Sequence, residues 1–368
     1  MKVALLPAAA LLLAAAAALV GTAAGTFSDL AQVGGNTFST ADCFPTWWWN
    51  TSYLYRRQVT VTTGAASVSG GYSVMATLDH AALVSAGKSQ ADGDDIRVLY
   101  WNAGACGWAE LDRALDQNSS WNSSSSKIWY KLQAGIAASS FDSNYYLYYG
   151  YTGAASPPAD ESSVYLYWDD FESYAVGVAP TGWTVISGDY SIVNDGGNKV
   201  LRSIGSTSGR HVIYRNAIAE ANICVSSGVR TNDVTNVNMG PAARATGTIE
   251  SNSNYYSFHF RRTDNSNHLA KVVNGTWTSI ASTPQTVSNN TWYRYDIGAA
   301  GSTLKGWFNG TQQLSSTDTA LPGAGSVGVY SVYGTADSGD TIDEDNFIAR
   351  LFVDPEPALT LGAEQLKP

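Results

Sequence analysis

Hydrophobic and polar residues alternate with a period of two along much of the chain after residue 54. In the first half, this alternation is clearest in Tyr55–Thr62, Tyr72–Leu78, Ile96–Trp101, Lys127–Leu132 and Tyr145–Tyr149. Successive side chains of a β-strand point to opposite faces, so each run predicts a strand. Only Ala81–Gly87 and Glu110–Leu115 are predicted to form brief helices.

A second series of predicted strands extends from Val164 to Val353. Turn-forming residues separate these strands and predict hairpins, the strongest being Asn-Gly between alternating runs. The hairpin signals are NDGG at 194–197, DNSN at 264–267, VNGTW at 273–277 and FNGTQ at 308–312. Regularly spaced strands without a long helix favour a two-sheet sandwich over a parallel α/β sheet. One more short strand, PALTL, is predicted after Phe352.

The N-terminus has the composition of a secretory signal peptide. Met1 and Lys2 precede a nearly pure Ala and Leu tract that ends in small residues, and cleavage is expected near Ala24. An uncleaved membrane anchor is the alternative, because the apolar stretch is near the lower limit for a span. We therefore expect a secreted or cell-surface protein with no membrane span after processing.

The three cysteines become disulfide candidates if the chain is secreted. Cys43 and Cys106 both fall in the first half, so they are the expected pair, which leaves Cys224 over. The alternative is that all three are small, buried apolar residues.

Composition and charge narrow the function classes. Only 14% of the 368 residues are charged and the formal net charge is -10. The 21 Lys and Arg residues form no basic stripe that could neutralise phosphates, so nucleic acid is not an expected partner. The shortage of charged residues also disfavours coiled coils and helical bundles.

Twelve Trp and 21 Tyr residues make the chain rich in aromatic side chains. Flat rings on the surface of a sandwich can stack on sugar rings. Four tryptophans beside turn residues are the predicted platform for a glycan: Trp183, Trp277, Trp292 and Trp307. The alternative for each is packing in the core.

Several strands of the first half resemble a family of secreted domains of unknown function. The resemblance is carried by YRRQVTVT at Tyr55, DGDDIRVLYW at Asp92, KIWYKL at Lys127 and YYLYYG at Tyr145. In such proteins a concanavalin A-like or laminin-G-like sandwich often follows, and WDDFES at Trp168 is similar to that arrangement. Residues 25–38 are weakly similar to the start of camelysin and TasA-like secreted proteins.

The resemblance implies an all-β fold with two tandem antiparallel β-sandwiches, jelly-roll or concanavalin-like, after a signal peptide. The paired prolines 157 and 158 interrupt any strand ladder and mark the linker between them. The expected domains are a signal peptide at 1–24, an extended segment at 25–46, one sandwich at 47–151, a linker at 152–163, a second sandwich at 164–362 and a tail at 363–368.

Two acidic segments, WDDFES and DEDNF, would meet if the first and last strands of the second sandwich are neighbours, as in the resembling family. Carboxylate oxygens suit calcium, so a structural calcium ion is a candidate cofactor. Its expected ligands are Asp169, Asp170, Glu172, Asp343 and Asp345. The alternative is a solvated acidic strand edge that discourages aggregation.

Catalysis is not expected. Concanavalin-like glycoside hydrolases need two carboxylates that flank the scissile bond, and the Glu-x-Asp-x-x-Glu pattern of laminarinases is absent. No serine lies in a Gly-x-Ser-x-Gly turn, and His259 and His268, which bracket a predicted hairpin, are expected at ordinary strand or turn positions.

These observations favour a non-catalytic binding or adhesion protein, with an extracellular glycan as the leading partner and a neighbouring surface protein as another. A structural subunit that self-assembles into a fibre or surface layer by strand addition is the alternative. A concanavalin-like glycoside hydrolase is third.

Overall fold

The computed structural model describes residues 31–33, 36–38, 48–232, 236–337 and 339–368. The predicted signal peptide, most of the extended segment and Cys43 lie outside these residues. Residues 52–100 and 110–368 form one compact unit, and residues 101–109 are assigned to another. Within the described ranges, no helix is both long enough and apolar enough to cross a membrane.

The fold is all-β and antiparallel, as predicted, and its first sandwich combines a five-stranded and a three-stranded sheet. The larger sheet has the order β25 (Ala358–Leu366), β3 (Tyr55–Thr62), β9 (Phe141–Tyr149), β5 (Arg97–Asn102) and β6 (Gly107–Leu111). The smaller sheet contains β4 (Ser73–Leu78), β8 (Ser126–Lys131) and β7 (Arg113–Leu115). The short helices are α2 (His80–Ser85) and α3 (Glu161–Val164), and β1 (Ala31–Val33) pairs with β2 (Asn36–Phe38).

The five strands predicted in the first half are confirmed, and so is the helix near Ala81, whose counterpart is α2. The helix predicted at Glu110–Leu115 is wrong. These residues hold the end of β6 and all of β7, and β7 pairs with β8. Six residues without a cap are too few to form a stable helix against the pairing that an adjacent strand offers.

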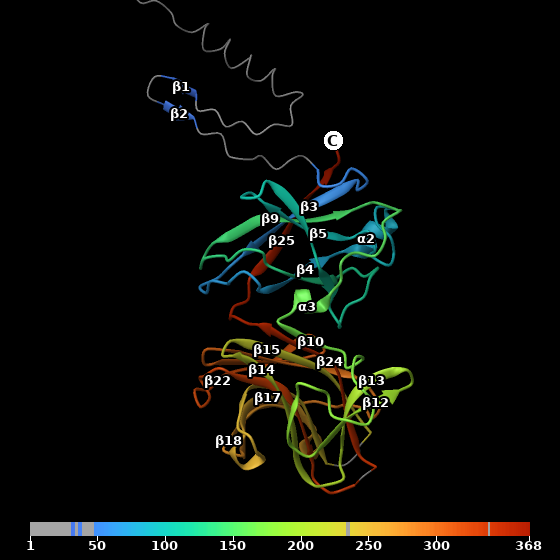
Figure 1. Ribbon diagram of the computed structural model, residues 1–368, viewed down its shortest axis with the longest axis vertical. Helices are drawn as coiled ribbons and strands as arrows, with labels where there is room; N and C mark the ends of the chain where they lie inside the picture. The colour runs from blue at the N-terminus through green and yellow to red at the C-terminus, as the bar shows by residue number, and fades with distance from the viewer. Residues whose placement is uncertain (1–30, 34–35, 39–47, 233–235, 338) are drawn as a thin grey trace, which may run out of the picture. The chain divides into compact units, whose positions relative to one another are not determined.

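The terminal strand β25 belongs to the first sandwich. Its residues pair antiparallel with β3, from Ala358 opposite Thr62 to Leu366 opposite Tyr55. In Figure 1 the red C-terminal strand accordingly lies beside the blue β3. The sequence predicted the strand but grouped it with the second sandwich. Alternation identifies a strand without naming its partner.

The second sandwich has two large sheets. Sheet I has the order β12 (Asp189–Asp195), β13 (Asn198–Ile204), β24 (Thr341–Leu351), β15 (Ile223–Thr231), β20 (Tyr293–Ala300), β21 (Thr303–Phe308) and β22 (Thr311–Thr317), with β10 (Tyr167–Asp169) also on β24. Sheet II has the order β11 (Thr184–Ser187), β14 (Gly209–Glu220), β23 (Gly325–Tyr333), β16 (Val237–Thr246), β17 (Asn254–Arg261), β18 (Ser266–Val273) and β19 (Thr276–Pro284).

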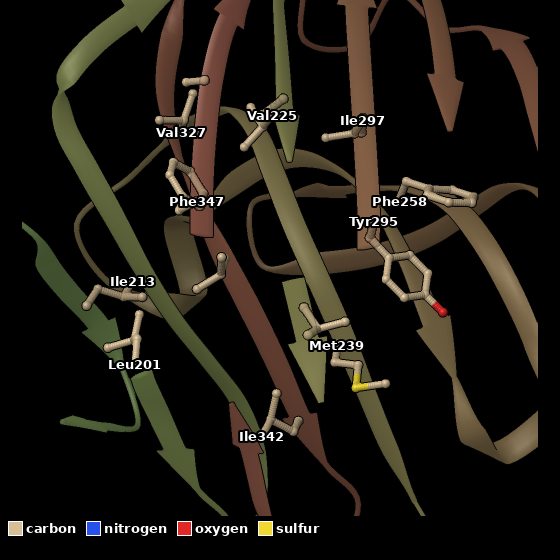
Figure 2. Close-up of a cluster of buried hydrophobic side chains, with 14 of the residues drawn as sticks. Leu201, Ile213, Val225, Met239, Phe258, Tyr295, Ile297, Val327, Ile342 and Phe347 are labelled. Atoms are coloured by element: carbon tan, nitrogen blue, oxygen red, sulfur yellow. The ribbon is translucent and has the colours of Figure 1, made fainter. Parts of the chain in front are cut away.

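The core of this sandwich lies between the two sheets. Figure 2 shows Val225, Tyr295 and Ile297 from sheet I, with Met239 and Phe258 from sheet II. All of these side chains are fully buried in one cluster. Each strand contributes alternate residues to this cluster, which leaves the other half of its side chains for an outer face.

Asn-Gly turns connect the strands where the sequence predicted them. Asn274-Gly275 joins β18 to β19 and Asn309-Gly310 joins β21 to β22, and all four residues have positive φ. Two successive left-handed residues define the type I′ turn, whose twist matches a two-residue hairpin.

Cys106 is disulfide-bonded, and its predicted partner Cys43 lies outside the described residues. Cys224 is a free thiol buried on β15, where desolvation raises its pKa to about 12. A thiol with so high a pKa is unreactive at neutral pH.

Candidate functional site: the outer face of sheet II

Alternation places an unusual set of side chains on the outer face of sheet II. On β17, Tyr256 and Phe258 point into the main core, and the alternate residues Tyr255 and His259 point away from it. Tyr255 forms a separate buried cluster with other residues of this face, including aromatic residues of β14 and β23 and aliphatic residues of β14, β16 and β18. The fully buried members of that cluster are Val212, Tyr214, Ala242, Ala245, Tyr255, Val272 and Tyr330.

Aromatic rings form a continuous row across this face. The ring centroids of Tyr214 and Tyr255 are 6.3 Å apart, and those of Tyr255 and Tyr330 are 5.5 Å apart. His259 continues the row, with its centroid 4.9 Å from that of Tyr330 and 6.2 Å from that of Trp277. We call these five residues the aromatic row.

Small residues form the floor beneath the row. Gly240 on β16 lies beside Tyr330 in the register, and Ala242 lies beside Gly328 and Ser257. A Cβ atom at Gly240 would come within 2.5 Å of the Phe258 carbonyl oxygen. The floor therefore has no room for larger side chains, and the tyrosine rings occupy the space above it.

The far side of the sheet folds back over this face. Arg210 on β14 donates from Nη2 to the carbonyl oxygen of Gly275 at 3.0 Å, although three strands lie between β14 and β18 in the sheet. Gly275 also donates its backbone N–H to Ser253 at 2.9 Å, which ties the β18–β19 turn to the segment before β17. The face is therefore concave and covered, so that Tyr214, Tyr255 and Tyr330 are at most 1% exposed.

Polar atoms gather in this enclosure without protein hydrogen-bond partners. Such atoms are uncommon in folded proteins, where buried donors and acceptors are nearly all bonded to protein or ordered water. Each normally costs about 1–3 kcal/mol when left unsatisfied. The six buried atoms concerned are Arg210 Nη1, Tyr214 Oη, Tyr255 Oη, His259 Nε2, Trp277 Nε1 and Tyr330 Oη.

Burial keeps the aromatic row uncharged. Desolvation raises the pKa values of Tyr214, Tyr255 and Tyr330 above the ordinary value of 10.0. Desolvation, reinforced by the neighbouring His268 and Arg261, lowers the pKa of His259 well below 6.5. The row therefore presents neutral hydroxyl, imidazole and indole groups at physiological pH.

His259 and His268 lie directly opposite each other on β17 and β18, with ring centroids 5.8 Å apart. His259 Nδ1 is bonded to Ser257 Oγ at 3.0 Å, which leaves Nε2 facing the enclosure. His268 is bonded through both nitrogens, to Ser279 at 2.8 Å and Asp264 at 3.0 Å. The sequence places the two histidines on either side of a predicted hairpin, at what are expected to be ordinary strand or turn positions. They pair because they lie equally far from the four-residue turn at 262–265, which follows Arg261 and precedes its partner Ser266.

The four predicted platform tryptophans do not form one platform. Trp183 packs in the core and donates from Nε1 to Asp169 at 2.9 Å. Core packing, the alternative to a glycan platform, is therefore the role that the structure gives to Trp183. Trp277 belongs to the aromatic row of sheet II. Trp292 directly precedes β20 of sheet I and is 37% exposed, and Trp307 lies on β21 of the same sheet and lines a cavity.

The acidic segments meet as predicted, since β10 pairs with β24 and Asp169 lies opposite Phe347. All five expected calcium ligands accept hydrogen bonds from protein donors. Asp169 accepts from Tyr167, Tyr174 and Trp183, and Asp343 accepts from Arg202 and Arg230. Asp345 accepts from the Asn198 side chain, and Glu172 and Asp170 accept from the backbone N–H groups of Lys199 and Glu172.

The negative charges of Asp170 and Glu172 act on the third ligand of this group, Asp345. The pKa of Asp345 is raised to about 6, mainly by desolvation and further by Asp170 and Glu172. Among the described residues, no group of three His, Cys, Asp or Glu side chains has the geometry to hold a metal ion. Calcium binding stays a prediction.

No protein-family model and no curated protein matches the chain. The resemblance of the first half to a secreted domain of unknown function therefore stays a prediction. Several solved structures are similar to part of the chain. A carbohydrate-binding module, CBM66, of Bacillus subtilis is 16% identical over 46% of this chain and 96% of its own, with a TM-score of 0.38.

A Bacillus subtilis protein of unknown function with a galectin-like fold is 13% identical, over 51% of this chain and 96% of its own, with a TM-score of 0.41. A β-glucanase of Bacillus licheniformis is 12% identical, over 51% of this chain and 98% of its own, with a TM-score of 0.39. These values are too low to indicate a function for this chain.

Proposed function

We propose that the chain is a non-catalytic carbohydrate-binding protein whose saccharide site is the aromatic row on sheet II. The observation that carries this proposal is the set of six buried polar atoms without protein partners on one concave face. Sugar hydroxyls donate and accept hydrogen bonds, so one saccharide could bond to tyrosine, histidine, tryptophan and arginine atoms together. The aromatic rings between these atoms would pack against the apolar faces of the sugar.

The side chains of the aromatic row are uncharged and suit the hydroxyl groups of a sugar, and the guanidinium of Arg210 adds a cationic donor on the same face. Tyr214, Tyr255 and Tyr330 are protonated and His259 is neutral, because burial opposes the charged form of each. The side chains of the aromatic row include no Asp or Glu, whereas glycoside hydrolysis uses a pair of carboxylates on either side of the bond. This chemistry supports binding without cleavage.

The cover consists of the β18–β19 turn at Asn274–Gly275 and the segment Glu250–Ser253 to which this turn is bonded. Entry of a saccharide requires the cover to move away from the aromatic row. The Arg210–Gly275 hydrogen bond links the cover to β14, and Ile249, next to the short helix Glu250–Asn252, is 55% exposed. A loop that buries little apolar surface opens at low cost, so the cover is the movable part and the sheet is the rigid part.

The test replaces Tyr214, Tyr255 and Tyr330 together by Phe, which keeps the rings and removes only the hydroxyl groups. Native electrophoresis in gels that contain barley β-glucan, xylan, levan or galactan shows whether the protein is retarded, and titration calorimetry gives its affinity. We expect binding to be at least about tenfold weaker, because each lost hydrogen bond contributes about 0.5–1.5 kcal/mol. Folding should be little impaired, since the Tyr255 hydroxyl has no protein partner, and those of Tyr214 and Tyr330 approach Ser253, Asn238 and Ser257 without forming well-aligned hydrogen bonds.

Tyr190→Phe is the matched control. The Tyr190 hydroxyl donates to the His211 carbonyl oxygen at 3.0 Å in the core, so its removal should lower stability and leave saccharide binding unchanged. If the triple variant bound every polysaccharide as the wild type does, the row would be a structural cluster and the proposal would be wrong.

A further inference from the structure

The outer face of sheet I also carries a cavity. One wall is formed by side chains of β15, β20 and β24, including Asp296 and Arg350, and the other by the segment Asp116–Asn118 and by Trp129 on β8. The inner part, which is itself partly open to solvent, has a volume of about 130 Å³. A more open part of about 420 Å³ adjoins it through the shared residues Gln117, Asn118 and Arg294, and extends to Trp292. We call the two parts together the junction groove.

Hydrogen bonds and ring contacts hold the walls of the junction groove in place. Arg294 Nη1 donates to the Gln117 side chain and, at 2.8 Å, to the Asn346 carbonyl oxygen. Trp129 Nε1 donates to Asp116 Oδ2 at 2.8 Å, and the Arg350 guanidinium lies 4.7 Å from the centroid of the Trp129 ring. A site with walls positioned in this way does not have to be ordered by its ligand.

One carboxylate of the groove is incompletely paired. Asp296 Oδ1 lies 3.6 Å from Arg294 Nε, which is too long for a hydrogen bond, and its side chain is 16% exposed. The Ser226 hydroxyl donates a hydrogen bond to the same carboxyl group, and desolvation raises the pKa of Asp296. Asp296 can therefore accept hydrogen bonds from hydroxyl groups that enter the cavity.

The formal charges of the cavity wall cancel. Three cationic residues (Lys127, Arg294 and Arg350) lie against three acidic residues (Asp116, Asp296 and Glu356). A wall of this kind offers donors and acceptors without attracting either anions or cations. The indoles of Trp129 and Trp307 supply the apolar surface of the inner part.

Trp292 supplies an exposed ring in the open part. It is 37% exposed, with the Arg230 guanidinium 4.7 Å from its centroid. The amides of Gln117, Asn118 and Asn309 lie on the same lining. An exposed indole among side-chain amides is a surface on which a chain of sugar units can extend.

We infer that the junction groove is a second carbohydrate site, which holds the terminal sugar of a neutral glycan chain in its inner part and the following units along Trp292. Asp296 accepts hydroxyl groups of the terminal sugar, and the tryptophans pack against its carbon–hydrogen faces. This site differs from the aromatic row in location and in chemistry, because it combines paired charges with an open approach. It does not depend on whether sheet II binds a saccharide.

The experiment compares Trp292→Ala and Asp296→Asn with Phe141→Ala, an exposed aromatic residue of β9 that belongs to neither carbohydrate site. Cellotetraose, xylotetraose and a levan-derived tetrasaccharide are titrated into each protein by calorimetry. We expect at least one of these probes to bind about tenfold more weakly to both groove variants, and to bind Phe141→Ala as it binds the wild type. Trp292 is partly exposed, so that its variant should fold, and thermal melting checks this.

Binding of every probe unchanged in both groove variants, or no binding of any probe by the wild type, would overturn the inference. The two carbohydrate sites fail separately. A loss with the Tyr214, Tyr255 and Tyr330 triple variant alone supports only sheet II, and a loss with Trp292→Ala and Asp296→Asn alone supports only the junction groove.

Discussion

The two outer faces of the second sandwich differ in whether their polar side chains are bonded to other protein groups. On sheet I, charged residues are bonded to one another, as Asp343 is to Arg202 and Arg230. On sheet II, the hydroxyls of Tyr214, Tyr255 and Tyr330 are buried without partners. Buried polar groups that are bonded stabilise a structure, and those that are not bonded lower its stability unless water or a ligand supplies the missing bonds. The comparison separates a face that holds the fold together from a face suited to a ligand.

The largest effect is expected on sheet I. Asp343→Ala should lower the free energy of unfolding by about 2–4 kcal/mol, because it leaves two guanidinium groups facing each other without their shared carboxylate. Chemical denaturation measures the loss. Asp195→Ala is the matched control, since Asp195 is a more exposed partner of the same Arg230 and an exposed pair contributes about 0–1 kcal/mol. Equal losses in the two variants would contradict the distinction between a buried network and surface pairs.

A smaller effect is expected at Asp345, on the interior strand β24 of the same sheet. Its pKa is about 6 in the folded protein and near 3.8 when unfolded, because burial disfavours the charged form. Ionisation of Asp345 therefore destabilises the fold as the pH rises from about 4 to 6. Asp345→Asn should be more stable than the wild type by about 2 kcal/mol above pH 6 and equal to it below pH 4. Melting curves across this range measure the difference, and a constant difference would show that the charge is not its cause.

The smallest effect is expected on sheet II and has the opposite dependence on pH. The pKa of His259 is well below 6.5, mainly through desolvation, so the unfolded chain binds this proton more readily than the folded one. Stability should fall as the pH drops below 6.5, by up to about 1 kcal/mol for the first pH unit. His259→Gln should weaken this fall. Melting curves of the two proteins at pH 7.5 and 5.5 test it, and parallel declines would assign the fall to other groups.

The sequence was sufficient to predict strands and hairpins but not the candidate site. Alternation in Tyr55–Thr62 and the Asn-Gly turn at 274–275 are local signals, and both were correct. Tyr214, Tyr255 and Tyr330 come from three strands that the chain order does not place together, so their row depends on strand order and on the folding back of the sheet. Core packing was an alternative for every tryptophan, and it describes Trp183.

The pairing of β25 with β3 has a consequence for how the chain is made. A ribosome releases β3 about 300 residues before it releases its edge partner, so the largest sheet of the first sandwich is incomplete while the whole second sandwich is synthesised. During that time the backbone edge of β3 has no strand partner on the side that β25 later occupies. Lys88 and Tyr149 also lack the carboxylate of Glu364, to which both are bonded in the complete protein. The first sandwich is thus the first to be synthesised and the last to complete its sheet.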